Sequence, residues 1–520
     1  MKRGKTLLYN IFLLTGASMF MRAAGVGFQV YLAGVIGPAG IGLFQLIISA
    51  QLLALTVATS GIRFATCRLV SEELGLGRPG NVPKVMVRCI THALFFGALA
   101  GTALFLGADR IGHTWIGDGR TVLALRLLSV SLPIVACTAA LSGYFVAVSR
   151  VVKSASAQVL EHGIRIFVVV ILLTLFPPAD LEIAAALVAI GSVSAELLSG
   201  FILFLLYLHD KRKLAKRGTP GTPGTPGTQF SRRLLAISMP LAISTYARSA
   251  LNTLQHMLVP RGLQRSGADS DAALTSYGLV HGMALPIILF PSALFYAVAE
   301  LVVPELTAAQ VAGDQARIRY LVSKLLRISL YVSICLAGLF LAWGLELGRV
   351  IYPSAGEVGP YIRLLALLMP IMFLDAITDG MLKGLGQQVY SMGINIADSL
   401  VSVALVWFLL PIFGVSGFIF MVYFTELFNF LLSLRRIAQM TVLQISLGDV
   451  VKPVLSIFAA TQVVPLVLRA LGLPLALSAF SLAMHFLLAG FVYLGFLFLL
   501  GCLGLGDVRW ARRAFLGGRV

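Results

Sequence analysis

Long, almost uncharged apolar runs recur throughout this chain of 520 residues and constrain its fold more than any other feature. Each run is long enough to cross the hydrocarbon core of a bilayer, which takes roughly 20 residues of α-helix. Within lipid every backbone polar group needs a partner in the protein, so only helices and closed barrels can span a membrane. The runs are too long and too uniformly apolar for barrel strands. The sequence therefore predicts an all-α polytopic membrane protein.

The apolar runs predict about fourteen transmembrane helices, separated by short charged or Gly/Pro-rich breaks. Composition agrees, since 58% of the residues are hydrophobic and only 12% are charged. The first run follows a basic start but is too long for the apolar core of a signal peptide, so we expect it to be retained. The predicted spans are 7–36, 40–68, 85–107, 122–148, 155–176, 182–208, 234–260, 273–303, 320–345, 359–382, 390–411, 415–434, 452–470 and 475–503.

The chain is strongly basic, with 40 Lys and Arg against 22 Asp and Glu and a net charge of +18. If both termini are cytosolic, most basic residues fall on cytosolic segments or helix ends. This distribution is the positive-inside pattern, which fixes orientation and supports an even number of spans. The charge therefore indicates a plasma membrane protein with cytosolic termini and no nucleic-acid partner.

The five cysteines and seven histidines are dispersed along the chain without metal-ligand spacing. We expect packed free thiols, no metal site and no cofactor.

The chain contains an internal repeat. The segment LRLLSVSLPI (125–134) resembles IRLLALLMPI (362–371), and LVSEEL (69–74) resembles LVVPEL (301–306). Because each copy holds an even number of spans, both copies have the same orientation. They are predicted to form two six-helix bundles related by a pseudo-two-fold axis along the membrane normal, with a cleft between them. The clearest repeated polar residues are Ser18, Arg22 and Gln29 of the first span and Ser244, Arg248 and Gln255 of the seventh, at identical spacing.

The repeat predicts four segments: an N-terminal bundle over 1–208, a linker over 209–233, a C-terminal bundle over 234–438, and two extra helices with a basic cytosolic tail over 439–520. The linker carries seven basic residues and a tandem Gly-Thr-Pro repeat, which favours an extended, solvated chain. It is interpreted either as a hinge or lipid-binding basic patch, or as a low-complexity connector.

Arg22 is the first candidate site residue, because a permanent charge within a membrane span is costly. Ser18, Arg22 and Gln29 share one stripe of their helix. The equivalent stripe of the seventh span holds Arg248 and Gln255, with Asn252 beside it. Two guanidinium groups facing one cleft suit phosphate recognition, since arginine offers a planar fork of donors. The alternative is that each arginine pairs with a buried carboxylate such as Glu196, Glu426 or Asp398 and locks helices together.

Other intramembrane charges permit two interpretations. Arg63 either extends the cationic path or snorkels to the headgroups. Arg165 lies four residues after Glu161, the spacing of a helical ion pair, and Asp379 has the same relation to Lys383. The candidates for ion coupling are the carboxyls of Asp375, Asp398, Glu196 and Glu426.

Matched prolines, Pro133 and Pro370, predict kinks that would let the two halves rock, or that serve helix packing alone.

Two long segments carry a family resemblance: SMFMRAAGVGFQVYLAGVIGPAGIGLFQL near the N-terminus and YGLVHGMALPIILFPSALFYAVAELVVPEL in the eighth span. With the doubled architecture and the two extra helices, they resemble the multidrug/oligosaccharidyl-lipid/polysaccharide (MOP) exporter superfamily, in its stage V sporulation protein B and MurJ-like group. The resemblance implies a V-shaped pair of bundles with alternating access. It also implies that helices 13 and 14 form a groove for a lipid tail.

The same resemblance suggests site residues. Arg22 and Arg63 match arginines that contact pyrophosphate in helices 1 and 2 of MurJ-type proteins. In helix 8 the pattern departs, because the neighbourhood of Ala284–Pro286 has no arginine. This departure bears on lipid II as the substrate more than on the class of flippase.

The sequence thus predicts a flippase, not an enzyme, for an undecaprenyl-pyrophosphate-linked saccharide such as a peptidoglycan precursor or polysaccharide repeat unit. The expected partners are this lipid-linked saccharide, membrane lipids and proteins of cell-wall or polysaccharide synthesis, and the protein is expected to be a monomer in a bacterial plasma membrane. The alternatives are an ion-coupled drug or cation antiporter, and a non-transporting scaffold for envelope assembly.

Overall fold

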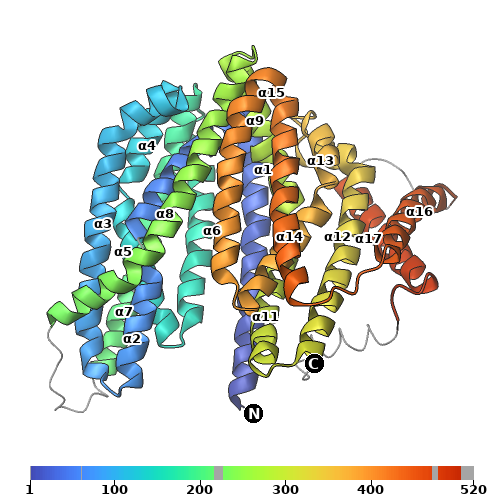
Figure 1. Cartoon of the computed structure of the whole chain (residues 1–520). Coiled ribbons are helices and arrows are strands. Elements are labelled where there is room, and N and C mark those ends of the chain that lie inside the picture. The colour runs from blue at the N-terminus through green and yellow to red at the C-terminus, as the bar shows by residue number, and fades with distance from the viewer. Residues whose placement is uncertain (1, 60, 216–226, 471–477, 505–520) are drawn as a thin grey trace. The chain divides into compact units, whose positions relative to one another are not determined.

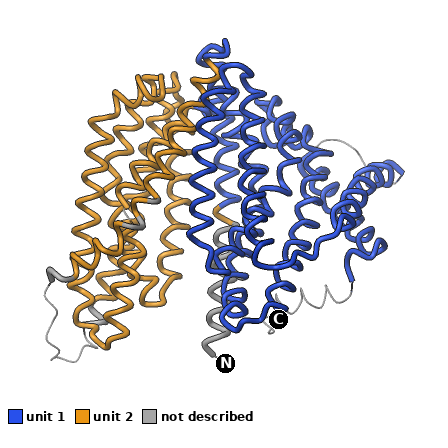
Figure 2. Tube along the Cα trace, viewed as in Figure 1, with its two compact units in different colours: residues 1–9, 22–42, 265–520 blue, residues 10–21, 43–264 orange. Residues whose placement is uncertain are grey.

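The computed structural model describes residues 2–59, 61–215, 227–470 and 478–504, and these residues contain helices and no β-strand (Figure 1). The prediction of an all-α protein is confirmed. Contacts divide the chain into two compact units, which Figure 2 colours separately. Unit 1 comprises residues 1–9, 22–42 and 265–520, and unit 2 comprises residues 10–21 and 43–264.

Unit 2 is built from the second part of α1 and the helices that follow it. Its longest helices are apolar runs that end at glycines, prolines or charged residues, as the sequence predicts. The elements are α1 (Lys2–Thr59, residues 10–21 and 43–59 in this unit), α2 (Ile62–Gly75), η1 (Pro79–Asn81), α3 (Val82–Arg110), η2 (Ile111–Ile116), η3 (Gly119–Thr121), α4 (Val122–Ser129), α5 (Leu132–Ala147), α6 (Val151–Leu175), α7 (Leu181–Ala215) and α8 (Gly227–Arg265).

Unit 1 combines residues 22–42 of α1 with the remaining helices. A short π-helix, η4, lies between the first two of these remaining α-helices, and π-helical turns are frequent at functional sites. The elements are α9 (Ser270–Tyr277), η4 (Gly278–Ala284), α10 (Leu285–Leu289), α11 (Ser292–Val311), α12 (Gln315–Ile351), α13 (Val358–Ala366), α14 (Met369–Gly384), α15 (Gln388–Met440), α16 (Gly448–Ala470) and α17 (Ala479–Leu499).

Two very long helices are each broken at a glycine. The 58 residues of α1 include Gly37 with φ 69°, and the 53 residues of α15 include Gly414 with φ 55°. A straight helix of that length would measure roughly 80 Å, far more than the hydrocarbon core. Both glycines adopt a backbone conformation that other residues rarely adopt, so each helix is two segments joined at a sharp break.

In the part of the chain that the structure describes, ten helices are long and apolar enough to cross a membrane, or twelve if each bent pair is one span. The number is lower than fourteen partly because α1 and α15 each join two predicted spans across a single glycine. The count of fourteen therefore stays a prediction. The bent pairs lie where the matched prolines predict kinks: α4 and α5 meet at 47° beside Pro133, and α13 and α14 meet at 56° beside Pro370.

The units do not follow the contiguous halves of the predicted repeat. Residues 22–42 of the first half pack in unit 1, and α8, from the second half, packs in unit 2. Around the predicted linker, α7 continues to Ala215 and α8 begins at Gly227. Most of the linker's Gly-Thr-Pro repeat lies outside the described residues. The division of the chain into four segments stays a prediction.

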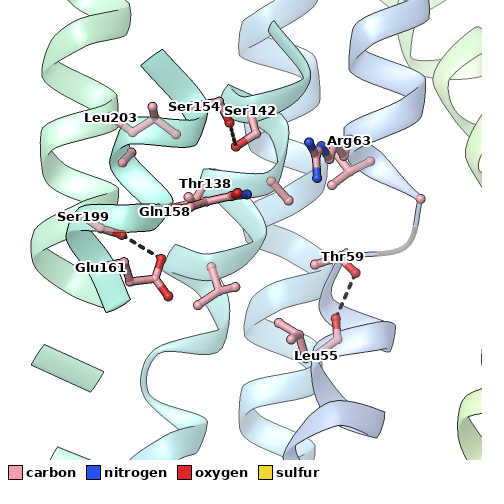
Figure 3. A pocket seen from close by; sticks show the side chains of 15 residues that line it. Leu55, Thr59, Arg63, Thr138, Ser142, Ser154, Gln158, Glu161, Ser199 and Leu203 are labelled. Atoms are coloured by element: carbon pink, nitrogen blue, oxygen red, sulfur yellow. Dashed lines mark hydrogen bonds between the residues drawn. The ribbon is translucent and has the colours of Figure 1, made fainter. Parts of the chain in front are cut away.

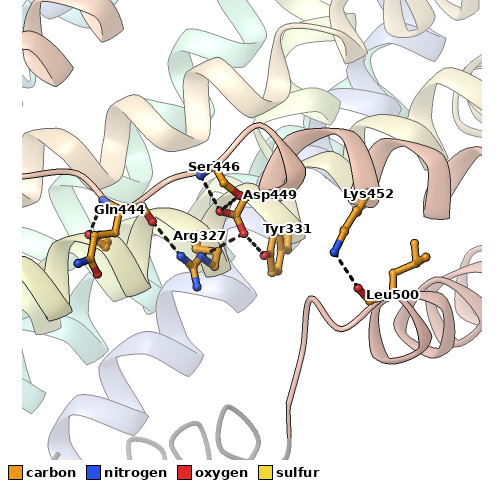
Figure 4. A network of polar contacts seen from close by, with 8 residues as sticks. Arg327, Tyr331, Gln444, Ser446, Asp449, Lys452 and Leu500 are labelled. Atoms are coloured by element: carbon orange, nitrogen blue, oxygen red, sulfur yellow. Dashed lines mark hydrogen bonds and ion pairs between the residues drawn. The ribbon is translucent and has the colours of Figure 1, made fainter.

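The two extra helices attach to α12 through a polar network (Figure 4). Asp449, at the start of α16, accepts a hydrogen bond from Tyr331 at 2.7 Å and pairs with Arg327 at 3.2 Å. On α17, Tyr493 donates to the backbone oxygen of Tyr331 at 2.8 Å. Lys452 of α16 also donates to the Leu500 carbonyl at 3.0 Å. Within unit 1, the bonds to Arg327 and Tyr331 hold α16 and α17 against α12, and the Lys452 bond joins α16 to the residue after α17.

Candidate functional site

Arg22 contacts the beginning of α11 within unit 1. Its Nη1 donates to Ser292 Oγ at 2.9 Å, and its guanidinium lies over the Tyr296 ring, 5.6 Å from the centroid. Ser292 and Tyr296 are one turn apart, on the same face of α11. Arg22 is exposed and forms no ion pair with the residues that the structure describes. Since a guanidinium carries five N–H donors, most of its donors remain available to an anion.

Gln29 lies two turns further along α1 and forms a hydrogen bond with a different element. Its Nε2 donates to the backbone oxygen of Gly282, inside the π-helix η4. A π-helix turns more widely than an α-helix, and the Gln29 amide satisfies one of its carbonyl groups. In this conformation Gln29 therefore joins α1 to η4. Ser18 is on the same helix, but its side chain lies outside the described residues.

Unit 2 contains a cavity of about 390 Å³ between the end of α1 and α2, α5, α6 and α7, with polar side chains on a largely apolar wall (Figure 3). Arg63 of α2 faces it, is exposed, and forms no hydrogen bond or ion pair within the described part of the chain. The other polar side chains are hydroxyls, the Gln158 amide and the Glu161 carboxyl, which pairs with Arg165. Arg63 is therefore the lining cation without an ion-pair partner, and with the neutral groups it suits a polar ligand with negative charge. The main polar lining residues are Thr59, Arg63, Thr138, Gln158, Glu161 and Ser199.

Arg248 lies on α8, which is fixed to α1 in unit 2. Thr253 donates to the Ser49 carbonyl at 3.0 Å, and the hydroxyls of Ser249 and Thr56 are 3.1 Å apart. Arg248 itself is exposed and makes no hydrogen bond or ion pair with described residues.

The other two candidates on α8, Asn252 and Gln255, are half-buried and each has a polar or electrostatic contact. The stripe on α8 lies in unit 2, whereas Arg22 and Gln29 lie in unit 1. The convergence of the two stripes on one cleft stays a prediction.

Arg165 differs from these three arginines. Its Nη2 lies 2.9 Å from Glu161 Oε1 and 3.4 Å from Glu196 Oε1. The predicted Glu161–Arg165 helical pair is confirmed. The alternative of ion pairing with a buried carboxylate therefore describes Arg165 and Glu196, but none of Arg22, Arg63 and Arg248 among the described residues.

The remaining acidic candidates gather in unit 1. The carboxyls of Asp375, Asp398 and Glu426 lie close enough to interact electrostatically. Asp375 is half-buried, and its Oδ1 has no hydrogen-bond partner among the described residues. Tyr296 lies within electrostatic reach of Glu426 and Asp375 as well as of Arg22.

Among the described residues, Asp379, unlike Asp375, has an ion-pair partner and a hydrogen-bond donor. Lys383 Nζ lies 2.6 Å from its Oδ2, as the spacing predicts, and Ser391 donates to Oδ1. No group of three or more His, Cys, Asp or Glu side chains in the described residues is arranged to hold a metal ion.

The sequence did not predict Ser292 and Tyr296, the two residues that contact the Arg22 guanidinium. They are 270 and 274 positions away in the chain, so no local pattern links them to Arg22. A weak signal exists, because Pro291 interrupts the eighth span just before Ser292, and a helix that starts within a membrane exposes backbone N–H groups.

The long apolar helices define a multi-pass membrane protein. A family model matches residues 7–310, more than half of the chain, and its family is described as polysaccharide biosynthesis protein. The chain belongs to that family.

Individual relatives agree. Stage V sporulation protein B of Bacillus subtilis (strain 168) is 26% identical over 416 residues, covering 79% of this chain and 80% of that protein. The solved structure of Lipid II flippase MurJ in an inward closed conformation matches with a TM-score of 0.69 and 14% identity, covering 93% of this chain and 98% of that one. An inward-facing multidrug resistance MATE family transporter of the MOP superfamily matches with a TM-score of 0.60 and 13% identity, over 81% and 95%. These matches confirm the resemblance to the MOP superfamily, and the fold is shared by its flippases and drug transporters.

Proposed function

We propose that this protein is a flippase that moves an undecaprenyl-pyrophosphate-linked saccharide from the cytosolic to the outer leaflet of a bacterial plasma membrane by alternating access. The protein would act without covalent chemistry. Its substrate would be a peptidoglycan precursor, as for the similar lipid II flippase, or a polysaccharide repeat unit, as the family description suggests. It would work as a monomer with both termini cytosolic, alongside proteins of cell-wall or polysaccharide synthesis.

One observation carries the proposal. Arg22, Arg63 and Arg248 lie within apolar segments and have no carboxylate partner among the described residues, although Arg165 has two. A guanidinium kept unpaired inside a membrane is costly unless a ligand supplies the counter-charge. A diphosphate can supply it, because its oxygens accept several charge-assisted hydrogen bonds at once.

The cavity beside Arg63 suits the sugar part of such a substrate. Its hydroxyl and amide lining can exchange hydrogen bonds with a polyhydroxylated head group, while the unpaired arginine faces the phosphate end. The undecaprenyl tail would stay in lipid.

Energy for transport would come from an ion gradient or the membrane potential. The carboxyls of Asp375, Asp398 and Glu426 in unit 1 and Glu196 in unit 2 are the candidates for ion coupling. An ion bound there would change the charge near Arg22 or near the cavity of unit 2, so occupancy by ion and substrate would be linked.

The fold also admits an antiporter for drugs or cations, since a MATE transporter shares it. Against this function, the unpaired intramembrane charges are positive and would repel cationic drugs. A scaffold without transport is disfavoured because it has no use for arginines within apolar segments that lack an ion-pair partner.

The test is binding of undecaprenyl-pyrophosphate-linked saccharides to the purified protein across a salt series. We expect Arg22→Ala, Arg63→Ala and Arg248→Ala to weaken binding and to flatten its salt dependence. Arg469→Ala is the matched control, because it removes an exposed arginine of α16 away from the three sites. Absent binding, or binding indifferent to all three arginines in folded protein, would contradict the proposal.

A further inference from the structure

Three charged side chains form a compact group in unit 2, near the middle of α6 and α7. The Arg165 guanidinium lies between two carboxyls, 2.9 Å from Glu161 Oε1 and 3.4 Å from Glu196 Oε1. With both carboxylates ionised the group would have a net charge of −1. A buried excess charge without a partner costs several kcal/mol in general, so a further positive charge is needed.

The two carboxyls are not equivalent. Glu161 accepts from Arg165 through one oxygen and from Ser199 Oγ at 3.0 Å through the other. Two donors, one of them charged, stabilise its ionised form. Glu196 has a longer contact with Arg165, and its Oε2 is buried without a hydrogen-bond partner among the described residues. Its side chain is 10% exposed, against 22% for Glu161.

Ser131 lies within hydrogen-bonding reach of the Glu196 carboxyl, and its hydroxyl is also 2.9 Å from the Leu128 carbonyl. This hydroxyl can donate to one of these two oxygens at a time, whereas it can accept from a protonated Glu196 in either case. The longer contact with Arg165 and the Oε2 without a partner therefore select Glu196, and not Glu161, as the carboxyl that takes the proton.

We propose that the Glu161–Arg165–Glu196 group is a proton site, in which Glu196 carries one exchangeable proton and Arg165 occupies the position that a metal cation would otherwise take. The site takes H⁺ and not Na⁺ because a guanidinium already fills the space between the carboxyls. The charged groups that face Glu196 are Arg165 and Glu161 of α6. His162, on the same helix, interacts with these two.

The proton site adjoins the polar cavity. Glu161 and Ser199 line the cavity (Figure 3). Arg165 links Glu161 to Glu196, which is not among the lining residues. A ligand charge near Arg63 would therefore act on Glu161 and, through Arg165, on the proton of Glu196. This link to transport depends on the proposed function, but the proton itself does not, so the two can fail separately.

The experiment is infrared difference spectroscopy of the purified full-length protein without substrate, read at the C=O stretch of protonated carboxyl groups. We expect a component of this band at neutral pH that is present in the wild type and absent in Glu196→Gln. Contributions from other buried carboxyls, such as Asp375 and Glu426, are the same in both proteins and cancel in the difference between the two spectra. Glu161→Gln should lose it as well, although Glu196 is intact, because Arg165 then neutralises Glu196 and no proton is needed. Glu182→Gln, at the exposed start of α7, is the matched control and should keep the band.

Two results would overturn the proposal. A band that persists in both Glu196→Gln and Glu161→Gln shows that Glu196 is ionised and that the group is a structural ion pair. A band that Na⁺ removes, when it replaces choline at constant ionic strength, shows a metal-cation site and overturns the proposal. If Glu196→Gln does not fold, Glu161→Gln alone still tests the charge balance.

Discussion

At the scale of single residues, Arg22 combines a fixed partner with free donors. The guanidinium is anchored on one side by Ser292 and Tyr296 and open on the other. Arg22→Lys keeps the charge but loses the planar fork, which matters for a bidentate phosphate contact. We expect Lys to recover only part of the roughly 10- to 100-fold affinity that Arg22→Ala loses, the magnitude of about 1.5–3 kcal/mol for a hydrogen bond to a charged group.

Titration calorimetry with the lipid-linked saccharide measures this difference. Full recovery by lysine would show that Arg22 acts as a point charge, and no loss with alanine would remove it from the binding site.

Ser292 is predicted to position Arg22 without contacting substrate. Ser292→Ala removes one hydrogen bond of 2.9 Å and leaves the stacking on Tyr296, so we expect affinity to fall about 3- to 10-fold, corresponding to about 0.5–1.5 kcal/mol. The loss should vanish when Arg22 is already alanine. A loss of equal size in that background would mean that Ser292 binds the ligand itself.

Local residue relations were predictable from the sequence, and distant ones were not. The pairs Glu161–Arg165 and Asp379–Lys383 follow from helical spacing and are present. Glu196 joins Arg165 only because α6 packs against α7, and Ser292 reaches Arg22 only because α11 packs against α1. Such contacts depend on packing between helices, which hydropathy does not encode.

At the scale of elements, α1 and the π-helix η4 meet through glycines. A Cβ on Gly278 would lie far inside van der Waals contact with the Pro38 carbonyl, and a Cβ on Gly42 would overlap the Leu274 carbonyl. The overlapping atoms are backbone and cannot turn away. The close approach therefore depends on the absence of both side chains.

We expect Gly278→Ala to destabilise the protein by about 1–3 kcal/mol, as overpacking does in general. Gly163→Ala is the matched control, because a Cβ on Gly163 of α6 meets nothing within 4 Å. Alanine there should be neutral or stabilising by up to about 1 kcal/mol, since it favours the helix. Thermal unfolding in detergent compares the two. Equal midpoints for both variants would show that the α1–η4 contact does not constrain stability.

The sequence predicts the local features of the helices but not how the helices pack. Apolar length predicts the helical class, and the proline positions predict the kinks beside Pro133 and Pro370. Both are local properties of the sequence. Hydropathy fails to predict that residues 22–42 and α8 each pack in the unit of the other half, because that choice depends on contacts such as Gln29 with Gly282 and Thr253 with Ser49.

At the scale of the whole molecule, the positive-inside pattern predicts which loops face the outside. In a cysteine-free background, Ala179→Cys, between α6 and α7, should react with a membrane-impermeant thiol reagent on spheroplasts. Leu76→Cys, an exposed site after α2, should react only after permeabilisation. The charge bias of the loops fixes this orientation. The reverse pattern would place the termini outside and invert the proposed direction of transport.

The predicted cleft requires one substrate to bind both Arg22 and Arg248, which belong to unit 1 and unit 2 respectively. If one diphosphate binds both arginines, removing either frees the ligand to shift toward the other, and the two losses are coupled. A double-mutant cycle on binding should then give an interaction energy of about 0.5–3 kcal/mol between Arg22→Ala and Arg248→Ala. The pair Arg22→Ala and Arg469→Ala should be additive. Additivity in both cycles would mean that the two units hold separate anions, and that substrate moves between two sites and does not bind at a single shared one.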